Sequence, residues 1–575
     1  MIEMEKKLTG YPSIDKPWLK YYTAEALQQK LKPNTIYGHL FERNREHMDD
    51  IALIYFERKI TYGQLFQQIE SCARSLTALG VNPGDIVTIQ TLAIPQTVIL
   101  LYALSRVGAV ANLIYVTSTE SEVNHFLKHT ESRLYFVLDG VYQQFSSALS
   151  GTQVEKVILL GVDTEMDSLT RLAYRLTNRK KNTYSENILS WKQFMQMEPE
   201  HYTDATVDEN RPVAMVYTGG TTGVSKAVVL SNRNINAVVF QYERSGMEFT
   251  RQNIFMNSLP PFIAFGLSVS LHLPLCTGVK MVLIPDPSAD SAANGFWKYR
   301  PNYYVAGPVQ LEAIFKRPNA LRIDFSFLKL LATGGDPLPA VREQAINDFL
   351  SSHCNKTVVV QGYGMTELAA TVCTGVPKAV RFGTCGIPLP DTNIKIIDTD
   401  TGKELGYGQQ GEVCIHGPSV MLGYYKEEVE TSNVLKQHED GQWWIHTGDI
   451  GSMDSDGFLT IVGRIKRIID IFKDTIWRKI FPKLLEEQLE KVPGVQSAVV
   501  VGDSDRPEDC DLVAFIVANP DQPVTEDALR NFAAQTFADF EWPARYHFLT
   551  ELPRTQLGKV DFRTLEREAQ KNTEG

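Results

Sequence analysis

The chain has 575 residues, of which 43% are hydrophobic and 22% are charged, and its formal net charge is −11 at pH 7. A chain of this length exceeds one ordinary hydrophobic core, so we expect at least two domains. The acidic balance argues against a general nucleic-acid-binding protein, which is normally basic. It does not exclude a nucleotide, because a local basic pocket is enough to bind one.

The seven cysteines are scattered, and no two of them have the C-x-x-C spacing. They therefore predict neither a disulfide framework nor a zinc site. The first seven residues lack the apolar segment of a signal peptide. The longest apolar stretch, residues 98–116, contains Ser105 and Arg106 and fits a buried helix followed by a strand better than a membrane span. We therefore expect a cytoplasmic protein without a transmembrane segment.

Residues 1–50 are predicted to form a polar and aromatic arm that ends in a helix. From Ile51 onward, apolar runs with strand character alternate with helical patterns, which predicts an α/β fold with largely parallel sheets. The expected strands are 51–55, 85–90, 111–116, 133–138, 212–217, 280–284, 303–306 and 328–333, and the expected helices are 63–79 and 96–107. Residues 164–210 are more polar and are predicted to be an inserted or connecting region.

Beyond residue 391 the pattern changes to short alternating strands separated by glycine turns, as at 393–397, 411–416 and 458–462. This pattern predicts a β-rich subdomain. A boundary is expected near residues 463–466, because the remaining 110 or so residues are enough for a small domain. The predicted domains are therefore 1–465 and 466–575.

Residues 217–231 follow the apolar strand 212–217 and combine three glycines, four hydroxyl side chains and Lys226 within ten residues. Glycine lets backbone N–H groups approach a phosphate, hydroxyls add donors, and lysine adds a positive charge. The segment therefore predicts a polyphosphate site, with a flexible linker as the alternative. It is not a Walker A loop, because Ser225 and Ala227 stand where that pattern needs Gly and Ser or Thr.

Four further stretches carry candidate functional residues: 332–336, 361–367, 444–449 and 552–559. In the second, Tyr363 could stack on a purine, Thr366 could bind phosphate and Glu367 could hold Mg²⁺, although a tight turn with a buried tyrosine is an alternative. Asp449 ends the third stretch and suits a ribose diol. Lys559 in the last would, taken alone, be an ordinary surface lysine.

These motifs occur in the order found in the adenylate-forming superfamily of acyl- and aryl-CoA synthetases, peptide-synthetase adenylation domains and luciferases, which the chain resembles from about residue 35 to 565. The resemblance implies a large N-terminal domain of layered α/β sheets with a β-rich subdomain, and a small mobile α+β C-terminal domain. It also implies two reactions: a carboxylate and ATP give acyl-AMP and pyrophosphate, and a thiol then takes the acyl group.

By matched position, the resemblance implies that Lys559 is the catalytic lysine, that Thr366 lies near the α-phosphate, and that Glu367 binds the metal ion. Lys466 falls at the hinge between the domains. The residues implied to bind the nucleotide are Thr218, Gly219, Gly220, Thr221, Thr222, Gly223, Lys226, Gly334, Gly335, Asp336, Gly362, Tyr363, Gly364, Met365, Asp449 and Arg464. Within this set, the threonines and Lys226 hold the β- and γ-phosphates, Gly334 and Tyr363 flank adenine, and Asp449 and Arg464 bind the ribose.

The expected acyl pocket is apolar or small in character, which favours a hydrophobic acid. Ile263 stands where amino-acid-activating relatives usually have an aspartate, so an α-ammonium group would be unpaired here. A medium- or long-chain fatty acid is the first expectation and an aromatic acid the second. The pocket residues are Phe262, Ile263, Phe265, Gly266, Gly307 and Val372.

Residues 468–482 depart from the family pattern, because the glycine-rich turn that lines the thiol tunnel in relatives is missing. CoA is the expected acceptor, and a carrier-protein thiol is the alternative, since Lys473, Arg478 and Lys479 could meet an acidic carrier or the phosphates of CoA. A surface loop with no acceptor role is equally compatible. A non-catalytic adenylate-binding protein is disfavoured, because five key positions of the family are retained. The sequence does not choose between a monomer and a homodimer.

Overall fold

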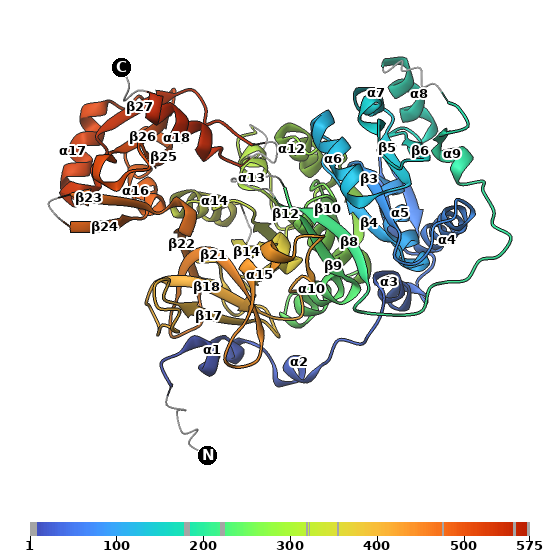
Figure 1. Cartoon of the computed structure of the whole chain (residues 1–575), viewed down its shortest axis with the longest axis horizontal. Coiled ribbons are helices and arrows are strands. Elements are labelled where there is room, and N and C mark those ends of the chain that lie inside the picture. Colours follow the sequence, from blue (N-terminus) through green and yellow to red (C-terminus); the bar gives the residue numbers. More distant parts are fainter. Residues whose placement is uncertain are drawn as a thin grey trace.

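The computed structural model describes residues 8–177, 184–218, 225–317, 320, 323–353, 356–473, 476–555 and 559–571. Within these residues the chain forms two large sheets, one smaller sheet beside them, and a separate C-terminal part with its own small sheets (Figure 1). The mixed α/β class predicted from the sequence is confirmed.

The first large sheet has eight strands in the order β19-β9-β8-β4-β3-β5-β6-β7. Its central strands are parallel and apolar on both faces; all five residues of β5 are buried, as expected for a sheet covered on both sides. The bounds are β3 Ile86–Gln90, β4 Val110–Leu113, β5 Leu134–Leu138, β6 Lys156–Leu160, β7 Ile188–Ser190, β8 Pro212–Tyr217, β9 Ala227–Ser231 and β19 Gly423–Tyr424.

The second large sheet has nine strands in the order β16-β15-β14-β13-β12-β10-β11-β1-β2, and strands β14 to β1 of this order are parallel. The bounds are β1 Ile51–Tyr55, β2 Arg58–Thr61, β10 Ile254–Asn257, β11 Lys280–Leu283, β12 Tyr303–Ala306, β13 Leu330–Thr333, β14 Val359–Met365, β15 Ala370–Thr374 and β16 Ile387–Pro388.

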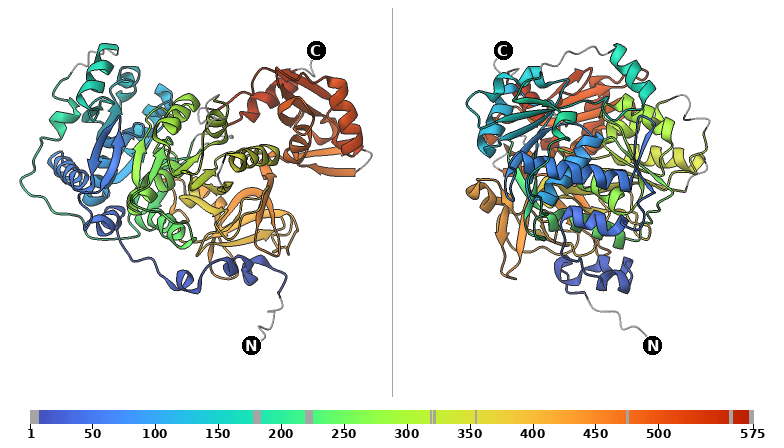
Figure 2. Two further views of the ribbon diagram at one scale, coloured as in Figure 1. Left: turned by 180° about the vertical axis from the view of Figure 1, so that it is seen from behind. Right: turned by 90° about the vertical axis from the view of Figure 1, so that its right-hand side faces the viewer.

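Helices α3, α5 and α10 and the π-helix Phe265–His272 pack on one another and touch strands of both large sheets, so one hydrophobic core joins the two sheets. The remaining helices lie along the outer faces or at the edges (Figures 1 and 2). The bounds of the longer helices in this part are α3 Ile36–Asn44, α4 Tyr62–Ala78, α5 Pro95–Val107, α6 Glu120–Thr130, α8 Ser168–Thr177, α10 Asn232–Arg244, α12 Ala289–Tyr299, α13 Pro308–Phe315 and α14 Ala340–Ser352.

Local sequence explains where helix α4 begins and where helix α5 begins and ends. Helix α4 begins after Thr61, whose side chain caps the N–H of Gln64 in a reciprocal capping box. Helix α5 begins at Pro95, which needs no N–H at that position, and ends at Gly108, which adopts the left-handed conformation with φ of 82°.

The predicted β-rich subdomain is a five-stranded antiparallel sheet in which β17, β18, β21 and β20 follow one another and β22 pairs with β21. Its strands are β17 Asn393–Ile397, β18 Gly411–His416, β20 Leu435–Gln437, β21 Trp443–Met453 and β22 Leu459–Arg464, and α15 Glu428–Val434 precedes β20.

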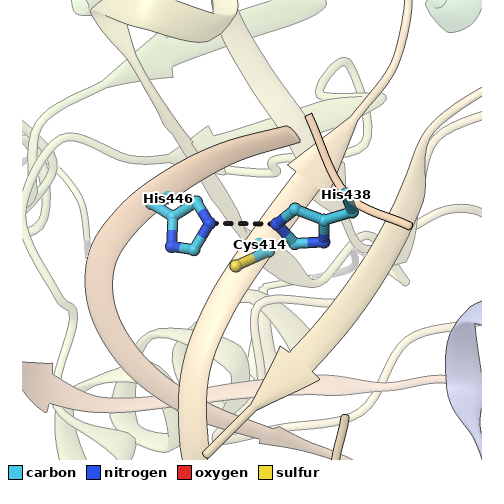
Figure 3. A group of neighbouring side chains, drawn as sticks. All are labelled: Cys414, His438 and His446. Atoms are coloured by element: carbon cyan, nitrogen blue, oxygen red, sulfur yellow. Dashed lines mark hydrogen bonds between the residues drawn. The ribbon is translucent and has the colours of Figure 1, made fainter. Parts of the chain in front are cut away.

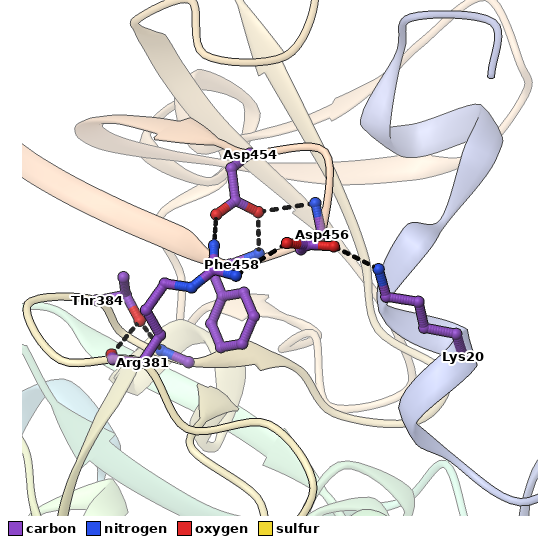
Figure 4. Close-up of polar contacts among 7 residues, drawn as sticks. Lys20, Arg381, Thr384, Asp454, Asp456 and Phe458 are labelled. Atoms are coloured by element: carbon purple, nitrogen blue, oxygen red, sulfur yellow. Dashed lines mark hydrogen bonds and ion pairs between the residues drawn. The ribbon is translucent and has the colours of Figure 1, made fainter.

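The N-terminal arm lies across this subdomain before it reaches α3 (Figure 1). Trp18 is fully buried, and Lys20 forms an ion pair with Asp456 at 2.5 Å. Asp456 also forms an ion pair with Arg381. The guanidinium group of Arg381 lies 3.9 Å from the ring centroid of Phe458 (Figure 4). The arm contains α1 Pro12–Asp15 and α2 Ala24–Gln28.

The C-terminal part stands at one end of the molecule, as Figure 1 and the left view of Figure 2 show. Its three-stranded sheet packs against two helices, α16 and α17, through one hydrophobic cluster. It packs against α18 through a second cluster. The bounds are β23 Ile469–Lys473, β24 Ile476–Ile480, α16 Pro482–Leu489, β25 Val495–Gly502, β26 Leu512–Ala518, α17 Glu526–Thr536, β27 Arg545–Leu549 and α18 Phe562–Lys571.

The structure differs from the sequence prediction in residues 164–210. This segment supplies β7, which adds the edge strand to the eight-stranded sheet, and α9 Trp191–Phe194, whose aromatic residues are buried. The segment is therefore partly integral to the fold. Its strand was missed because β7 has only three residues, Ile188–Ser190, and one of them is polar. Among the described residues, no helix is both long and apolar enough to cross a bilayer.

Candidate active site

The parallel pairing of three neighbouring strands stops at the same level in the nine-stranded sheet. Ala306 of β12 pairs with Thr333 of β13, and Thr333 pairs with Gln361 of β14. The glycines that follow these residues, Gly307, Gly334 and Gly362, therefore lie side by side. The carboxyl ends of parallel strands are the usual place for a ligand site in an α/β sheet.

The turn after β14 places Glu367 in the interior, with 7% of its surface exposed. Gly364 permits this turn, because a Cβ at that position would lie 1.7 Å from the carbonyl oxygen of Ala370. Just beyond Glu367, Ala369 adopts a left-handed φ of 54°. Such backbone strain is often found where a side chain has to be held in place at a functional site.

Glu367 is connected to Lys226 through Tyr424. The hydroxyl of Tyr424 donates to Glu367 Oε1 at 2.7 Å. The ammonium group of Lys226 lies 5.2 Å from the ring centroid of Tyr424 and forms an ion pair with Glu430 of α15. Burial raises the pKa of Glu367, and the Tyr424 hydrogen bond partly offsets that rise.

The glycine-rich segment connects the antiparallel strands β8 and β9. Thr218 and Lys226 close its base, since Thr218 N donates to the Lys226 carbonyl at 3.0 Å and Lys226 N donates to Thr218 Oγ1 at 3.2 Å. The predicted phosphate-binding residues between them lie outside the described residues: Gly219, Gly220, Thr221, Thr222 and Gly223.

The β-rich subdomain brings Asp449 to the same region. Asp449 pairs in register with Arg464 on β22, and their side chains form a salt bridge at 2.9 Å. Its other carboxylate oxygen accepts a hydrogen bond from the hydroxyl of Tyr363 at 2.7 Å. Burial raises the pKa of Asp449, and the charge of Arg464 lowers it.

The C-terminal part contributes Lys559 to this site. The positive charge of Lys559 lowers the pKa of both Asp336 and Asp449 against the upward effect of burial. Asp336 follows Gly334 and Gly335 after β13, so the lysine lies near two of the predicted nucleotide-binding stretches. Thr366 and Met365 lie between Tyr363 and Glu367 and are partly buried.

The predicted acyl-pocket residues occupy one apolar region beside these strand ends. The Phe262 ring packs edge-on against Tyr115, with centroids 5.2 Å apart. A Cβ on Gly334 would lie 3.4 Å from the Phe265 ring, so this ring borders the predicted adenine position. The π-helix that begins at Phe265 packs on β15, which carries the fully buried Val372. Ile263 and Gly266 belong to the same turn, where a Cβ on Gly266 would clash with the carbonyl of Pro260 at 2.0 Å.

Residues 468–482 form the antiparallel hairpin β23–β24, with residues 474 and 475 outside the described ones. Ile476 and Trp477 are 52% and 61% exposed, and the Trp477 ring lies 5.3 Å from Phe472. Lys473 pairs with Asp511 at 2.9 Å, and Lys479 pairs with Asp400 at 3.2 Å. These two lysines thus have partners within the chain. The predicted hinge residue, Lys466, lies in a single 3₁₀ turn between β22 and β23.

Two residues at this site were not predicted from the sequence: Tyr424, which donates to Glu367, and Glu430, which pairs with Lys226. Both residues follow the motif at 361–367 by about 60 residues. The pairing of β19 with β9 brings them beside Lys226. In the structure Gly423 adopts a φ of 143°, and the glycine before two tyrosines is the local sequence signal for this turn.

Comparisons with known proteins agree with this arrangement. A family model described as AMP-binding enzyme matches residues 40–425, and a model described as AMP-binding enzyme C-terminal domain matches residues 484–559. A long-chain-fatty-acid–CoA ligase of Bacillus subtilis is 27% identical over 571 residues, with 97% of this chain and 99% of the relative covered. A probable 4-coumarate–CoA ligase 1 of Dictyostelium discoideum is 28% identical over 557 residues, with 94% and 96% covered.

Solved structures share the fold at lower identity. ATP-bound MatB from Rhodopseudomonas palustris matches with a TM-score of 0.80 and 23% identity, covering 94% of this chain and 99% of that one. The anthranilate CoA ligase AuaEII in complex with anthranoyl-AMP matches with a TM-score of 0.81 and 22% identity, covering 96% and 100%. The chain therefore belongs to the family of AMP-binding enzymes and, as its motifs predicted, is an adenylate-forming acid–thiol ligase.

Proposed function

We propose that this ligase activates a hydrophobic carboxylic acid, with a medium- or long-chain fatty acid favoured, and transfers the acyl group to CoA. The observation that carries the choice of acid is the absence of any charged side chain between residues 259 and 276, the segment beside the adenylation site. Its one titratable imidazole, His272, is fully buried, and burial holds its pKa well below the usual range.

A neutral, apolar segment favours an acid without a second charge, because a buried ammonium or carboxylate would be left unpaired there. The relative from Bacillus subtilis is named for long-chain fatty acids, which supports the first candidate. An aromatic acid is the second candidate, because the relative from Dictyostelium discoideum is named for 4-coumarate and Phe262 and Phe265 offer ring faces.

In the proposed first step, a carboxylate oxygen of the acid attacks the α-phosphorus of ATP, and the bond from that phosphorus to the β-phosphate oxygen breaks. Negative charge grows on the α-phosphate and on the leaving pyrophosphate. Lys559 stabilises the first charge, and Lys226 stabilises the second after leaving Glu430. Asp449 and Arg464 orient the ribose, and Tyr363 and Gly334 flank the adenine.

Glu367 suits the Mg²⁺ ion that accompanies ATP. It is a buried carboxylate whose hydrogen-bond partner is the neutral hydroxyl of Tyr424, and no Lys or Arg of the described residues forms a salt bridge with it. Mg²⁺ prefers carboxylate and phosphate oxygens, so the donor fits the ion. When bound, the ion would neutralise charge on the phosphates.

In the proposed second step, a thiol loses its proton and its sulfur attacks the acyl carbonyl, after which AMP leaves as the acyl–oxygen bond breaks. CoA is the first acceptor candidate. The carrier-protein alternative depended on the cations of residues 468–482, and the pairing of Lys473 and Lys479 within the chain weakens that argument.

The test is pyrophosphate exchange into ATP with a panel of fatty acids of increasing chain length, aromatic acids and α-amino acids. We expect exchange to be greatest with a medium- or long-chain fatty acid and absent with amino acids. Exchange with aromatic acids alone would replace the first candidate by the second, and exchange with no acid would exclude the ligase function. Repeating the assay with CoA and with a pantetheinylated carrier protein then identifies the acceptor.

A further inference from the structure

The β-rich subdomain has a polar face on the side opposite its hydrophobic core. Along β17 and β18, Ile394 and Val413 point into the main core, whereas Lys395 and Cys414 pair in register on the other side of the sheet. Cys414 also pairs in register with His446 of β21. Because side chains alternate along a strand, this outer face gathers a thiol, an imidazole and a lysine from three strands.

Three potential metal ligands converge on this outer face: Cys414, His438 and His446 (Figure 3). One ligand atom from each lies within 4.8 Å of the other two, and Nε2 of His438 lies 3.0 Å from Nε2 of His446. His438 follows β20 at the start of the turn to β21, where its backbone N–H donates to the Gln442 carbonyl at 3.0 Å.

Neighbouring side chains hold both imidazoles in the orientation that a metal ion requires. His446 Nδ1 lies 2.8 Å from Glu412 Oε2 and donates to it, which leaves the Nε2 lone pair directed at the cluster. The other oxygen of Glu412 accepts from the N–H of Gly448 at 3.1 Å, so the carboxylate is itself fixed. Metal-ligating histidines almost always make this kind of second hydrogen bond to a carboxylate.

The ring of His438 is fixed by stacking on Trp444, with centroids 5.6 Å apart and planes 19° apart. On its other side, the ammonium group of Lys395 donates to His438 Nδ1 at 3.4 Å, so without a metal ion His438 Nε2 carries the ring proton and donates to His446 Nε2 at 3.0 Å. A metal ion bound to Nε2 would move that proton to Nδ1, which then faces the charge of Lys395. That charge does not stand alone, because Lys395 forms a salt bridge with Asp440 at 3.2 Å. Glu412 and Asp440 therefore balance the cations of this face, Lys395 and Lys436.

We propose that Cys414, His438 and His446 form a binding site for a transition-metal ion, with Zn²⁺ as the occupant and a water molecule as its fourth ligand. One thiolate and two imidazoles suit Zn²⁺ and do not suit Mg²⁺ or Ca²⁺, which prefer oxygen ligands. Two imidazole nitrogens bound to tetrahedral Zn²⁺ at about 2.0 Å lie about 3.3 Å apart, so the pair needs to open by only a few tenths of an ångström.

The site is separate from the predicted Mg²⁺ position at Glu367, but it is connected to the adenylation site through β21. His446 lies three residues before Asp449 on this strand, and Glu412 joins His446 to the backbone of Gly448. The ion would thus fix the strand that presents Asp449. No spacing in the sequence indicated the site, because its ligands come from β18, from β21 and from the turn between β20 and β21.

The first experiment uses Co²⁺ as a spectroscopic probe of the full-length protein after treatment with a chelator. We expect about one Co²⁺ per chain at this site, with a near-ultraviolet charge-transfer band from thiolate ligation, and we expect one equivalent of Zn²⁺ to abolish the band. Co²⁺ binding without a thiolate band would overturn the proposal.

Substitutions then assign the ligands. Cys414→Ser should remove the band, and His438→Asn and His446→Asn should each weaken Zn²⁺ binding by more than about 100-fold, while Glu412→Gln should weaken it by about 10- to 100-fold with the band retained. His416→Asn, an imidazole on the same sheet face, and Cys385→Ser, a thiol elsewhere, serve as matched controls that keep full binding.

Folding is checked by circular dichroism for every variant. If Cys414→Ser does not fold, His438→Asn decides the question, because that side chain lies at the end of a hairpin and is only partly buried. Zn²⁺ should raise the melting temperature of the wild-type chain and leave that of His438→Asn unchanged. Equal Zn²⁺ affinity of the wild type and both histidine variants would show that the two imidazoles merely share a hydrogen bond, and would refute the site.

Discussion

The hydroxyl of Tyr363 donates a hydrogen bond to Asp449 at 2.7 Å, across the junction between the nine-stranded sheet and the β-rich subdomain. Arg464 holds the second oxygen of the same carboxylate at 2.9 Å. The residue expected to flank the adenine thus also orients the residue expected to bind the ribose. We therefore expect adenine and ribose recognition to be coupled through this phenol.

The first prediction concerns this coupling. Tyr363→Phe keeps the ring and removes the hydrogen bond to Asp449, and a hydrogen bond to a charged group contributes about 1.5–3 kcal/mol. We expect kcat/KM for ATP to fall about 10- to 100-fold in pyrophosphate exchange at saturating acid. An unchanged kcat/KM with the fold intact would show that Asp449 does not depend on the phenol.

The second prediction concerns Lys559, whose charge acts on Asp336 and Asp449. Lys559→Ala should lower acyl-AMP formation by about two to three decades, because one transition-state donor is lost. Thioester formation from supplied acyl-AMP should persist. Lys571→Ala, on an exposed position of α18, is the matched control. Equal loss of both half-reactions in a folded variant would contradict the assigned role.

The third prediction concerns the ion pair between Lys226 and Glu430, which competes with phosphate for the lysine. Glu430→Gln should lower KM for ATP about two- to fivefold, because a partly exposed ion pair contributes no more than about 1 kcal/mol. Glu428→Gln, also on α15 but exposed, should have no effect. In a Lys226→Ala background, Glu430→Gln should also have no effect; a persistent change there would mean that Glu430 acts by another route.

The fourth prediction concerns pH. Burial raises the pKa of Glu490 to about 7, although Arg342 of α14 lowers it. This carboxyl binds its proton more tightly in the folded chain than in the unfolded chain. The free energy of unfolding therefore falls as pH rises from the unfolded pKa near 4.5 to about 7, by at most about 3 kcal/mol.

Glu490→Gln should therefore be more stable than the wild type at pH 8 and no more stable below pH 4.5. Calorimetric melting curves at these pH values provide the measurement, with Glu568→Gln at an exposed position of α18 as control. A stability gain of Glu490→Gln that is the same at both pH values would contradict the raised pKa.

The fifth prediction concerns the N-terminal arm. Trp18 is fully buried. Its backbone packs closely on Gly457, since a Cβ on Gly457 would lie 2.8 Å from the backbone N of Trp18. Trp18→Ala should cost about 3–5 kcal/mol of unfolding free energy, as for other large core truncations. Lys20→Ala removes an exposed ion pair with Asp456 and an ammonium group 5.1 Å from the Tyr21 ring centroid, and should cost less than about 1 kcal/mol. Comparable losses for the two variants in chemical denaturation would show that the arm is held by charge and not by burial.

The alternation of apolar runs predicted the α/β class, because buried parallel strands such as β5 are apolar throughout. The motifs could be found in the sequence because each is a short contiguous run, and the structure brings Tyr363 of β14, Glu367 after it and Asp449 of β21 into one region. Their roles, and that of Lys559, stay predictions. Tyr424 and Glu430 were not predicted, because their position depends on the pairing of β19 with β9. These strands are about 195 residues apart in the sequence, as the register of Gly423 with Val229 shows.

The missing glycines of residues 468–482 were visible in the sequence, but their consequence was not. The segment folds as a hairpin, and its lysines find Asp511 and Asp400 within the chain. Such pairing depends on the position of distant surface residues, which local patterns do not encode. The same limitation applies to the cluster at Cys414, whose three ligands are spaced like no metal motif.

The position of Lys559 beside Asp336 and Asp449 links the arrangement of the two domains to proton binding. Burial raises the pKa of both carboxyls, and the lysine opposes that rise. Any movement that withdraws Lys559 leaves two buried acids without its charge, so their proton affinity increases. We therefore expect that a displacement of Lys559 from these carboxyls would be accompanied by proton uptake, and that a more acidic medium would favour the displaced state.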